Sequence, residues 1–213
     1  MPTKIFFELN TDKQMKIIHT GISEFAAYGY ANSSTNRIVK NCGISKGSLF
    51  QYFTNKEDFF FYILDMVTAE FSESLAKEAA DLSKELFQRV IEYAALEFSW
   101  HIRNPEKSEL ILRAFSKNET AIYQKILARY GSKGQDIYYG LLEDINTGCF
   151  QWDRKMTIDI LKWFLKGFNE EFMETARLET RGFEQTKKDY IKSLTAHMEL
   201  LKNGLLKPDS PQE

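Results

Sequence analysis

Apolar residues recur every three or four positions along most of the chain, the spacing of one face of an α-helix, and no segment alternates as a strand would. The first apolar stripe begins at Met15, and Thr11 with Gln14 forms a capping-box start just before it. Gly29 stands where a left-handed residue often ends a helix. The pattern therefore predicts a first helix that stops just before Gly29.

Three more helices are predicted in the first third of the chain. Either Ser33 or Ser34 is expected to cap a short second helix, and Ser45 is expected to cap a short third one. Thr54 and Glu57 form another capping box, which predicts the start of a longer fourth helix.

The same spacing continues through the rest of the chain. It predicts helices over residues 82–101, 106–115, 118–145, 155–178 and 183–204. Gly131 and Gly134 are expected to interrupt the third of these, because each glycine costs about 1 kcal/mol of helix propensity. The sequence thus predicts an all-α protein of about nine helices. Its domains are a three-helix helix-turn-helix domain over 1–56, a larger helical domain over 57–206 and a mobile tail over 207–213.

The last two predicted helices carry more apolar side chains than one buried face needs. In the final helix the spacing is 3, 4, 3 and 4, through Ile191, Leu194, Met198, Leu201 and Leu205. The helix before it is apolar nearly all round, with Leu161, Phe164 and Phe168 among its residues. A helix of that kind must be covered on both sides. One side is expected to face its own domain and the other a partner chain; the alternative is that both helices complete a monomer's core.

Composition narrows the class of protein. No stretch of 18 uncharged apolar residues exists, and the first residues lack the pattern of a secretory signal, so no membrane association is expected. The cysteines, Cys42 and Cys149, are too few for a disulfide framework, which favours a reducing cytoplasm. The histidines lie on separate predicted helices, and no glycine-rich phosphate loop is present. We therefore expect no enzyme, no metal and no cofactor.

Charge is distributed unevenly. Residues 1–56 hold seven Lys or Arg against three Asp or Glu, a net +4, whereas the remainder is net −6. A basic N-terminal part joined to an acidic remainder is typical of a protein that binds a polyanion at one end. On charge alone, chance scatter explains the difference equally well.

The most informative segment is 34–53, which has the pattern of a helix, a tight turn and a second helix. Gly43 stands where the turn needs a positive φ, and Ser45 caps the second helix. The face of that helix offers donors suited to phosphates and base edges, from Lys46, Gly47, Ser48, Gln51 and Tyr52. Lys56, in the first turn of the next helix, is placed to hold a phosphate.

Each of these residues also has an ordinary structural explanation. Lys46 and Lys56 would by default be solvated charges, Gly47 a tolerated defect, and Tyr52 a half-buried core residue. Only their combination favours binding to DNA.

Residues 12–60 resemble the N-terminal domain of the tetracycline-repressor (TetR) family of transcriptional regulators. The resemblance is carried by Gly29-Tyr30, by the run from Gly43 to Phe50, and by Tyr52-Phe53 and Asn55-Lys56-Glu57, all at the family's spacing. Phe50 replaces the usual tyrosine and lacks its hydroxyl. The resemblance implies that DNA is also contacted by Ser34, Thr35, Asn36 and Arg37.

The resemblance further implies a homodimeric repressor that leaves a near-palindromic, double-stranded operator when a small effector binds. The dimer would be a four-helix interface formed by Leu161, Phe164, Phe168, Ile191, Leu194, Met198 and Leu201. The larger helical domain is rich in aromatic residues, Phe98 and Trp100 among them, which favours a lipophilic or aromatic effector. The sequence assigns no pocket residue. A binding module without regulation, such as a nucleoid or adaptor protein, is the alternative class.

Overall fold

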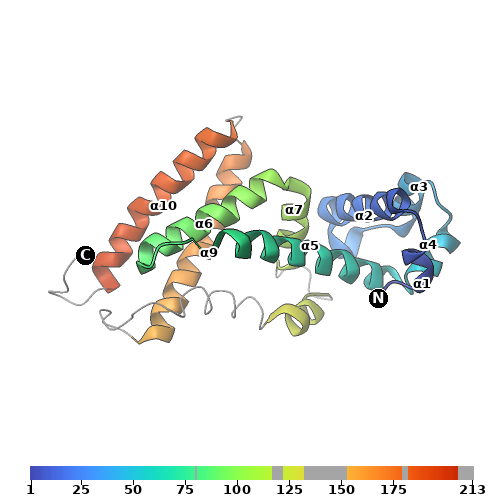
Figure 1. Cartoon of the computed structure of the whole chain (residues 1–213), viewed down its shortest axis with the longest axis horizontal. Coiled ribbons are helices and arrows are strands. Elements are labelled where there is room, and N and C mark those ends of the chain that lie inside the picture. Colours follow the sequence, from blue (N-terminus) through green and yellow to red (C-terminus); the bar gives the residue numbers. More distant parts are fainter. Residues whose placement is uncertain (80, 117–121, 132–152, 179–181, 206–213) are drawn as a thin grey trace. The chain divides into compact units, whose positions relative to one another are not determined.

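The residues that the structure describes form helices joined by short connections, with no strand among them. The structure is a computed structural model, and it describes residues 1–79, 81–116, 122–131, 153–178 and 182–205. The labelled helices of Figure 1 are α1 (Lys4–Phe7), α2 (Thr11–Asn32), α3 (Thr35–Cys42), α4 (Lys46–Tyr52), α5 (Lys56–Ala79), α6 (Leu86–Arg103), α7 (Pro105–Ala114), α9 (Arg154–Leu178) and α10 (Phe183–Leu205). A further helix covers residues 122–131. The prediction of an all-α protein with an N-terminal helix-turn-helix domain is confirmed.

The start of the chain differs from the prediction. A short helix, α1, precedes α2, and the N-cap of α2 is Asn10, whose side-chain oxygen accepts a hydrogen bond from the backbone N–H of Lys13 at 2.9 Å. The predicted capping box of Thr11 and Gln14 is therefore wrong by one residue. The Gln14 amide instead donates to the carbonyl of Leu9 at 2.7 Å and ties the α1–α2 connection to α2.

Gly29 has the predicted positive φ, at 66°, but it does not end the helix. Helical turns resume after it and continue to Asn32, so the glycine marks a kink inside α2. The next cap agrees with one of the two predicted choices, because the Ser34 side chain accepts from the backbone N–H of Arg37 and α3 starts at Thr35.

Two later helices begin at other residues than the pattern predicted. The side chain of Asn55, not Thr54, accepts from the backbone N–H of Asp58 at 2.8 Å, and α5 starts at Lys56. α6 starts at Leu86 instead of residue 82. The Arg89 guanidinium, in the first turns of α6, donates to the carbonyl of Ser83 at 2.6 Å and so ties the residues before α6 to that helix.

The chain divides into two compact units: residues 1–74 with 103–131, and residues 75–102 with 132–213. We call them the front unit and the rear unit. The predicted domain boundary at residue 56 stays a prediction. Close packing in the front unit is clearest at Gly21, where an added Cβ would lie 2.2 Å from Ile63 Cδ1 and 2.6 Å from Phe59 Cζ. Both of those side chains are fully buried, so only glycine lets α2 approach α5 so closely.

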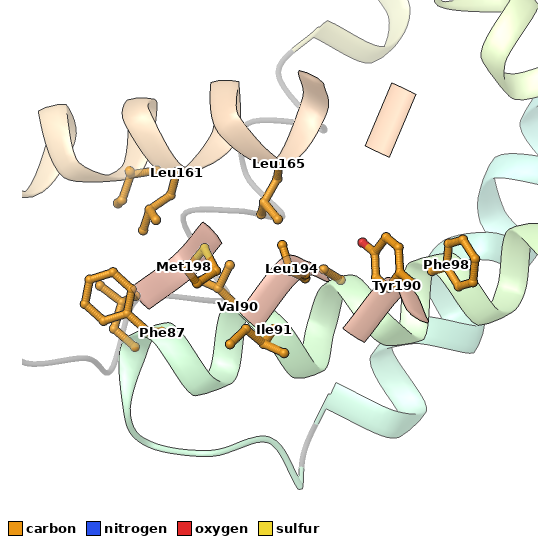
Figure 2. Packing of buried hydrophobic residues seen from close by; sticks show 12 residues of the cluster. Phe87, Val90, Ile91, Phe98, Leu161, Leu165, Tyr190, Leu194 and Met198 are labelled. Atoms are coloured by element: carbon orange, nitrogen blue, oxygen red, sulfur yellow. The ribbon is translucent and has the colours of Figure 1, made fainter. Parts of the chain in front are cut away.

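The core of the rear unit lies between α6, α9 and α10. Figure 2 shows Leu161 and Leu165 of α9 pointing toward Leu194 and Met198 of α10, with α6 side chains beside them. Twelve buried residues form this cluster: Leu86, Phe87, Val90, Ile91, Ala94, Phe98, Ile158, Leu161, Leu165, Tyr190, Leu194 and Met198.

This cluster corrects part of the predicted dimer interface. Leu161, Leu194 and Met198 are at most 2% exposed and pack inside their own chain, so they present nothing to a partner. The 3-4 spacing of α10 reflects packing on α6 and α9 within one chain. The other four predicted interface residues are partly buried against the edge of the cluster: Phe164, Phe168, Ile191 and Leu201.

Some predictions fall on parts of the chain that the structure does not describe. They are the helix beyond residue 131 with its second glycine, the side chain of Leu205, and the tail over 207–213. Within the described ranges, no helix combines the length and the apolar character needed to cross a membrane.

Candidate nucleic-acid interface

The turn between α3 and α4 is built as the sequence predicts. Gly43 has φ 70°, a left-handed conformation, and its backbone N–H donates to the carbonyl of Lys40 at 3.2 Å. The N–H of Ile44 donates to the carbonyl of Val39 at 3.0 Å, so the last carbonyls of α3 are satisfied within the turn. Cys42 is buried beneath it, and burial raises the pKa of its thiol. The turn thus fixes the direction in which α4 leaves.

Ser45 caps α4. Its hydroxyl oxygen accepts from the N–H of Ser48 at 3.0 Å and lies 2.8 Å from the Ser48 hydroxyl. Leu49 and Phe53 face inward and are at most 1% exposed, together with Ile38 from α3. These contacts leave the opposite face of α4 free for another molecule.

That opposite face carries most of the residues predicted for it. Lys46, Gly47 and Gln51 are exposed, and Phe50 is 39% exposed. An added Cβ at Gly47 would meet only the Ser45 hydroxyl, at 3.7 Å, so nothing inside the chain demands a glycine there. We call this surface, formed by Lys46, Gly47, Ser48, Phe50 and Gln51, the reading face. On α3, Asn36 is exposed and Thr35 half-buried.

Tyr52 does not belong to the reading face. It is 5% exposed, and its ring centroid lies 6.1 Å from that of Phe6 in α1. The turn of α4 that places Leu49 inward also carries the Tyr52 ring into the core, so a phosphate contact by its phenol stays a prediction.

Arg37 is engaged inside the protein. Its guanidinium donates to both carboxylate oxygens of Glu24, with distances of 2.6–3.1 Å, and to the carbonyl of Asn32 at 2.9 Å. It also lies 4.0 Å from the centroid of the Tyr28 ring. The bonds to Glu24 raise the pKa of Arg37. Glu24 itself is 5% exposed and accepts from the N–H of Ser34 at 2.7 Å, so this pair fixes the start of α3.

Lys56 is also engaged. Its ammonium group donates to the carbonyl of Tyr30 at 2.7 Å and to that of Ser33 at 3.2 Å. It lies 4.5 Å from the centroid of the Tyr30 ring. Lys56 therefore satisfies carbonyls at the end of α2 and links α2 to the first turn of α5, which the sequence did not indicate.

Sequence reasoning missed two supports of this site. Glu24 stands in the apolar stripe of α2, directly before Phe25, and a lone carboxylate in a buried face signals a buried cationic partner. The second support is α1, whose four residues are too few to give a periodic signal. Its Phe6 is fully buried.

Residues 17–63 match the family profile of the bacterial regulatory proteins of the tetR family. The uncharacterized HTH-type transcriptional regulator YxaF of Bacillus subtilis (strain 168) is 30% identical over 119 residues, which cover 54% of this chain and 60% of that protein. The fatty acid metabolism regulator protein of the same organism is 30% identical over 66 residues, or 31% of this chain and 34% of that protein. The match to these relatives thus spans less than two thirds of their length.

Solved structures extend the likeness to the whole chain. A TetR family transcriptional regulator from Chloroflexus aurantiacus J-10-FL superposes with a TM-score of 0.75 at 20% identity, over 98% of this chain and 100% of that one. The transcriptional regulator FadR from Bacillus subtilis, solved in complex with stearoyl-CoA, gives 0.64 at 16% identity, over 84% and 96%. Residues 17–63 therefore match the profile of the tetR family of bacterial regulatory proteins, and the chain as a whole has the TetR fold.

Proposed function

We propose that the protein is a sequence-specific, DNA-binding transcriptional regulator, a repressor that binds its operator as a homodimer. The observation that carries the proposal is the reading face, where exposed Lys46, Gly47, Phe50 and Gln51 and half-buried Ser48 lie on a helix whose other face is fixed in the core. The family match over residues 17–63 supports it. Two copies of α4 would enter successive major grooves of a near-palindromic site, about 34–36 Å apart.

The exposure of each residue supports one assignment of contacts. Lys46, Ser48 and Gln51 remain the candidates for base edges, and the exposed ring of Phe50 suits a thymine methyl group. Ser34, Thr35 and Asn36 remain candidates for contacts at the start of α3.

Two cations take supporting roles in this assignment. Arg37 and Lys56 already hold Glu24 and the end of α2, so we assign their chief part to shaping the surface on which the operator lies. Any phosphate contact they make would add to these bonds.

Selection from random DNA with the purified protein tests the function. A regulator should enrich one palindromic sequence, whereas a nucleoid protein would bind without enrichment and an adaptor would not bind. Gln51→Ala should then relax preference at one base pair by about 1–3 kcal/mol. Gln124→Ala, on an exposed position of the helix over 122–131, is the matched control and should change nothing.

A homodimer through α9 and α10 is the second part of the proposal. Trp163 and Leu200 are 69% and 73% exposed, which is unusual for such large apolar side chains on adjacent helices. Phe164, Phe168, Ile191 and Leu201, which are partly buried on the same two helices, are further candidates for contact with a second copy.

Sedimentation or light scattering at micromolar concentration tests the dimer. Leu200→Glu should shift the protein toward the monomer without disturbing the core, since Leu200 packs little within its own chain. Lys188→Glu, exposed on the same helix, is the control. A wild-type monomer would contradict the proposal.

We propose, third, that a lipophilic effector releases the operator. The stearoyl-CoA of the B. subtilis FadR structure suggests a long-chain acyl compound as the first candidate. The aromatic residues of the larger helical domain divide in the structure: Tyr93, Phe98 and Trp100 are buried, Trp163 is exposed, and Trp152 lies outside the described residues.

Operator affinity across a panel of lipophilic compounds, with direct binding followed by tryptophan fluorescence, tests this step. An effector should weaken operator binding by the factor by which DNA weakens effector binding, equivalent to about 1–3 kcal/mol. A compound that binds with no change in operator affinity is not an effector.

A further inference from the structure

The short N-terminal segment Thr3–Phe7 lies against the end of α4 that carries Gln51. Figure 1 shows α1 beside α4, and the two helices are in contact. This segment lies outside residues 17–63, the part of the chain that matches the family profile. Its contacts are therefore an addition to the helix-turn-helix unit.

Thr3 holds two backbone carbonyls at the end of α4. Its hydroxyl donates to the carbonyl of Gln51 at 2.7 Å, and its backbone N–H donates to the carbonyl of Tyr52 at 2.9 Å. The last carbonyls of a helix have no partner inside that helix. α4 is only seven residues long, and a helix of that length depends on support from outside.

Phe6 joins the same end of α4 to α5. It is 0% exposed, and its ring centroid lies 5.0 Å from that of Phe53 and 5.6 Å from that of Tyr62 in α5. The Tyr52 ring also lies near it, with 6.1 Å between the ring centroids. The segment is held in turn by Gln14 of α2, whose amide donates to the carbonyl of Phe7 at 3.4 Å and to that of Leu9, two residues on, at 2.7 Å.

We propose that Thr3 and Phe6 are positioning residues for DNA recognition, fixing the last turn of α4 and with it the direction of the Gln51 side chain. The proposal rests on the proposed function of the reading face. Thr3 holds the peptide of Gln51, a residue assigned to a base edge, so a change in the segment alters base readout without touching DNA.

Two substitutions remove the two kinds of support, and each has a matched control. Thr3→Val removes the hydroxyl donor and keeps the shape and the backbone N–H, whereas Thr3→Ser keeps the donor. Phe6→Ala removes the ring, whereas Phe6→Leu keeps an apolar side chain. Lys4→Ala, exposed in the same segment, tests whether a charge there contacts phosphate.

The affinities to measure are those for the selected operator and for random DNA, each as a function of salt. We expect Thr3→Val to weaken operator binding about five- to tenfold, in keeping with the loss of one hydrogen bond. Phe6→Ala should weaken it at least tenfold. Affinity for random DNA and the salt slope should stay unchanged, because no phosphate contact is lost. Thr3→Ser should restore wild-type affinity.

Amide hydrogen exchange of the DNA-free protein is the second readout. Exchange at Phe53, whose N–H bonds to the Leu49 carbonyl in the last turn of α4, should quicken in Thr3→Val and Phe6→Ala. Exchange in α6, in the rear unit, should not change. This readout stands even if Phe6→Ala loosens the front unit, because Thr3→Val alters a single hydroxyl.

The outcomes separate the two proposals. If the wild-type protein selects no operator, the proposed function fails, and hydrogen exchange alone decides whether the segment fixes α4. If an operator is selected and Thr3→Val and Phe6→Ala bind it like wild type, the positioning role is wrong. An equal loss on operator and random DNA with a reduced salt slope would also overturn it, since the segment would then contact phosphate directly.

Discussion

The front and rear units both have apolar cores, and they differ in the polar contacts that surround the reading face of the front unit. In the front unit, side chains bond to the backbone at several helix ends near the reading face: Ser34, Ser45 and Asn55 act as caps, and Lys56 holds the end of α2. In the rear unit, twelve buried residues pack between three helices, with the Tyr190 hydroxyl donating to the Asn169 side-chain oxygen at 2.6 Å.

The polar contacts and the apolar packing have different effects: the first set the direction of a helix, and the second sets the stability of the fold. A hydrogen bond fixes an angle, so the polar contacts of the front unit determine where α4 points and what its surface offers. Apolar packing has no preferred direction and contributes mainly free energy. Apolar side chains beyond those that fill the rear core remain exposed on α9 and α10, as Trp163 and Leu200. Substitutions in the rear unit should thus change stability and assembly, whereas those at front-unit caps should change DNA reading more than stability.

The largest expected effect lies in the rear core. Leu194 is 0% exposed and sits among the side chains of α6 and α9 (Figure 2). Leu194→Ala should lower the free energy of unfolding by about 2–5 kcal/mol, because it leaves a cavity. Urea unfolding measures it. Leu200→Ala, on the same helix but exposed, should change that free energy by less than about 0.5 kcal/mol. Equal losses in both variants would end the distinction between core and outer face.

The carboxyl group of Glu97 reports how far water reaches into the interior of the rear unit. Burial raises the pKa of Glu97 to about 7 from its ordinary 4.5, although the hydrogen bond from Tyr93 acts the other way. The raised pKa means that folding favours the protonated acid. Stability is then fully present below pH 4.5 and is lost as the pH rises toward 7, by about 3 kcal/mol at most.

Glu97→Gln should remove this pH dependence, since the amide stays neutral. The measurement is the difference in unfolding free energy between pH 5 and pH 8, for wild type and variant. We expect the variant to be the more stable protein at pH 8 and nearly equal at pH 5. The same pH dependence in both proteins would show that Glu97 is well hydrated.

A tight helix crossing gives the front unit its main sensitivity to volume. Gly21→Ala would force a methyl group against Ile63 and Phe59, at distances below 3 Å, and both side chains are fully buried. We expect a loss of about 1–3 kcal/mol, as is usual for overpacking. Gly204→Ala, where nothing lies within 4 Å, is the control and should be neutral or slightly stabilising. A neutral Gly21→Ala would mean that α2 and α5 slide apart readily.

The sequence predicted the helices and the turn well, because both depend on local patterns. Apolar spacing located the long helices, and Gly43 and Ser45 located the turn through backbone conformation and capping. The motif also identified the family whose profile matches residues 17–63. Most of the reading face followed, since a short helix with a known buried side leaves few residues outside.

Partners distant in sequence were not predictable. Lys56 appeared to be a solvated cation because the carbonyls it holds lie 23 to 26 residues earlier, and backbone groups leave no trace in the residue pattern. Arg37 likewise gave no hint of Glu24. In α10 the 3-4 spacing is the same for packing within one chain and for packing between two chains. Leu194 and Met198 were therefore predicted at a dimer interface, whereas they lie in the core of their own chain.

The smallest effect on stability should accompany a clear effect on DNA reading, at the cap of α4. Ser45→Ala removes the acceptor for the Ser48 N–H and should lower the free energy of unfolding by about 1 kcal/mol. Ser45→Asp keeps an acceptor and should restore stability. Because the freed first turn carries Lys46 and Ser48, operator affinity in Ser45→Ala should fall further than that stability loss explains. In Ser45→Asp, operator binding should stay weak despite restored stability, since the new charge repels phosphate. The test compares thermal unfolding with operator affinity in both variants. If affinity follows stability alone, capping only holds the helix together and does not direct its surface toward DNA.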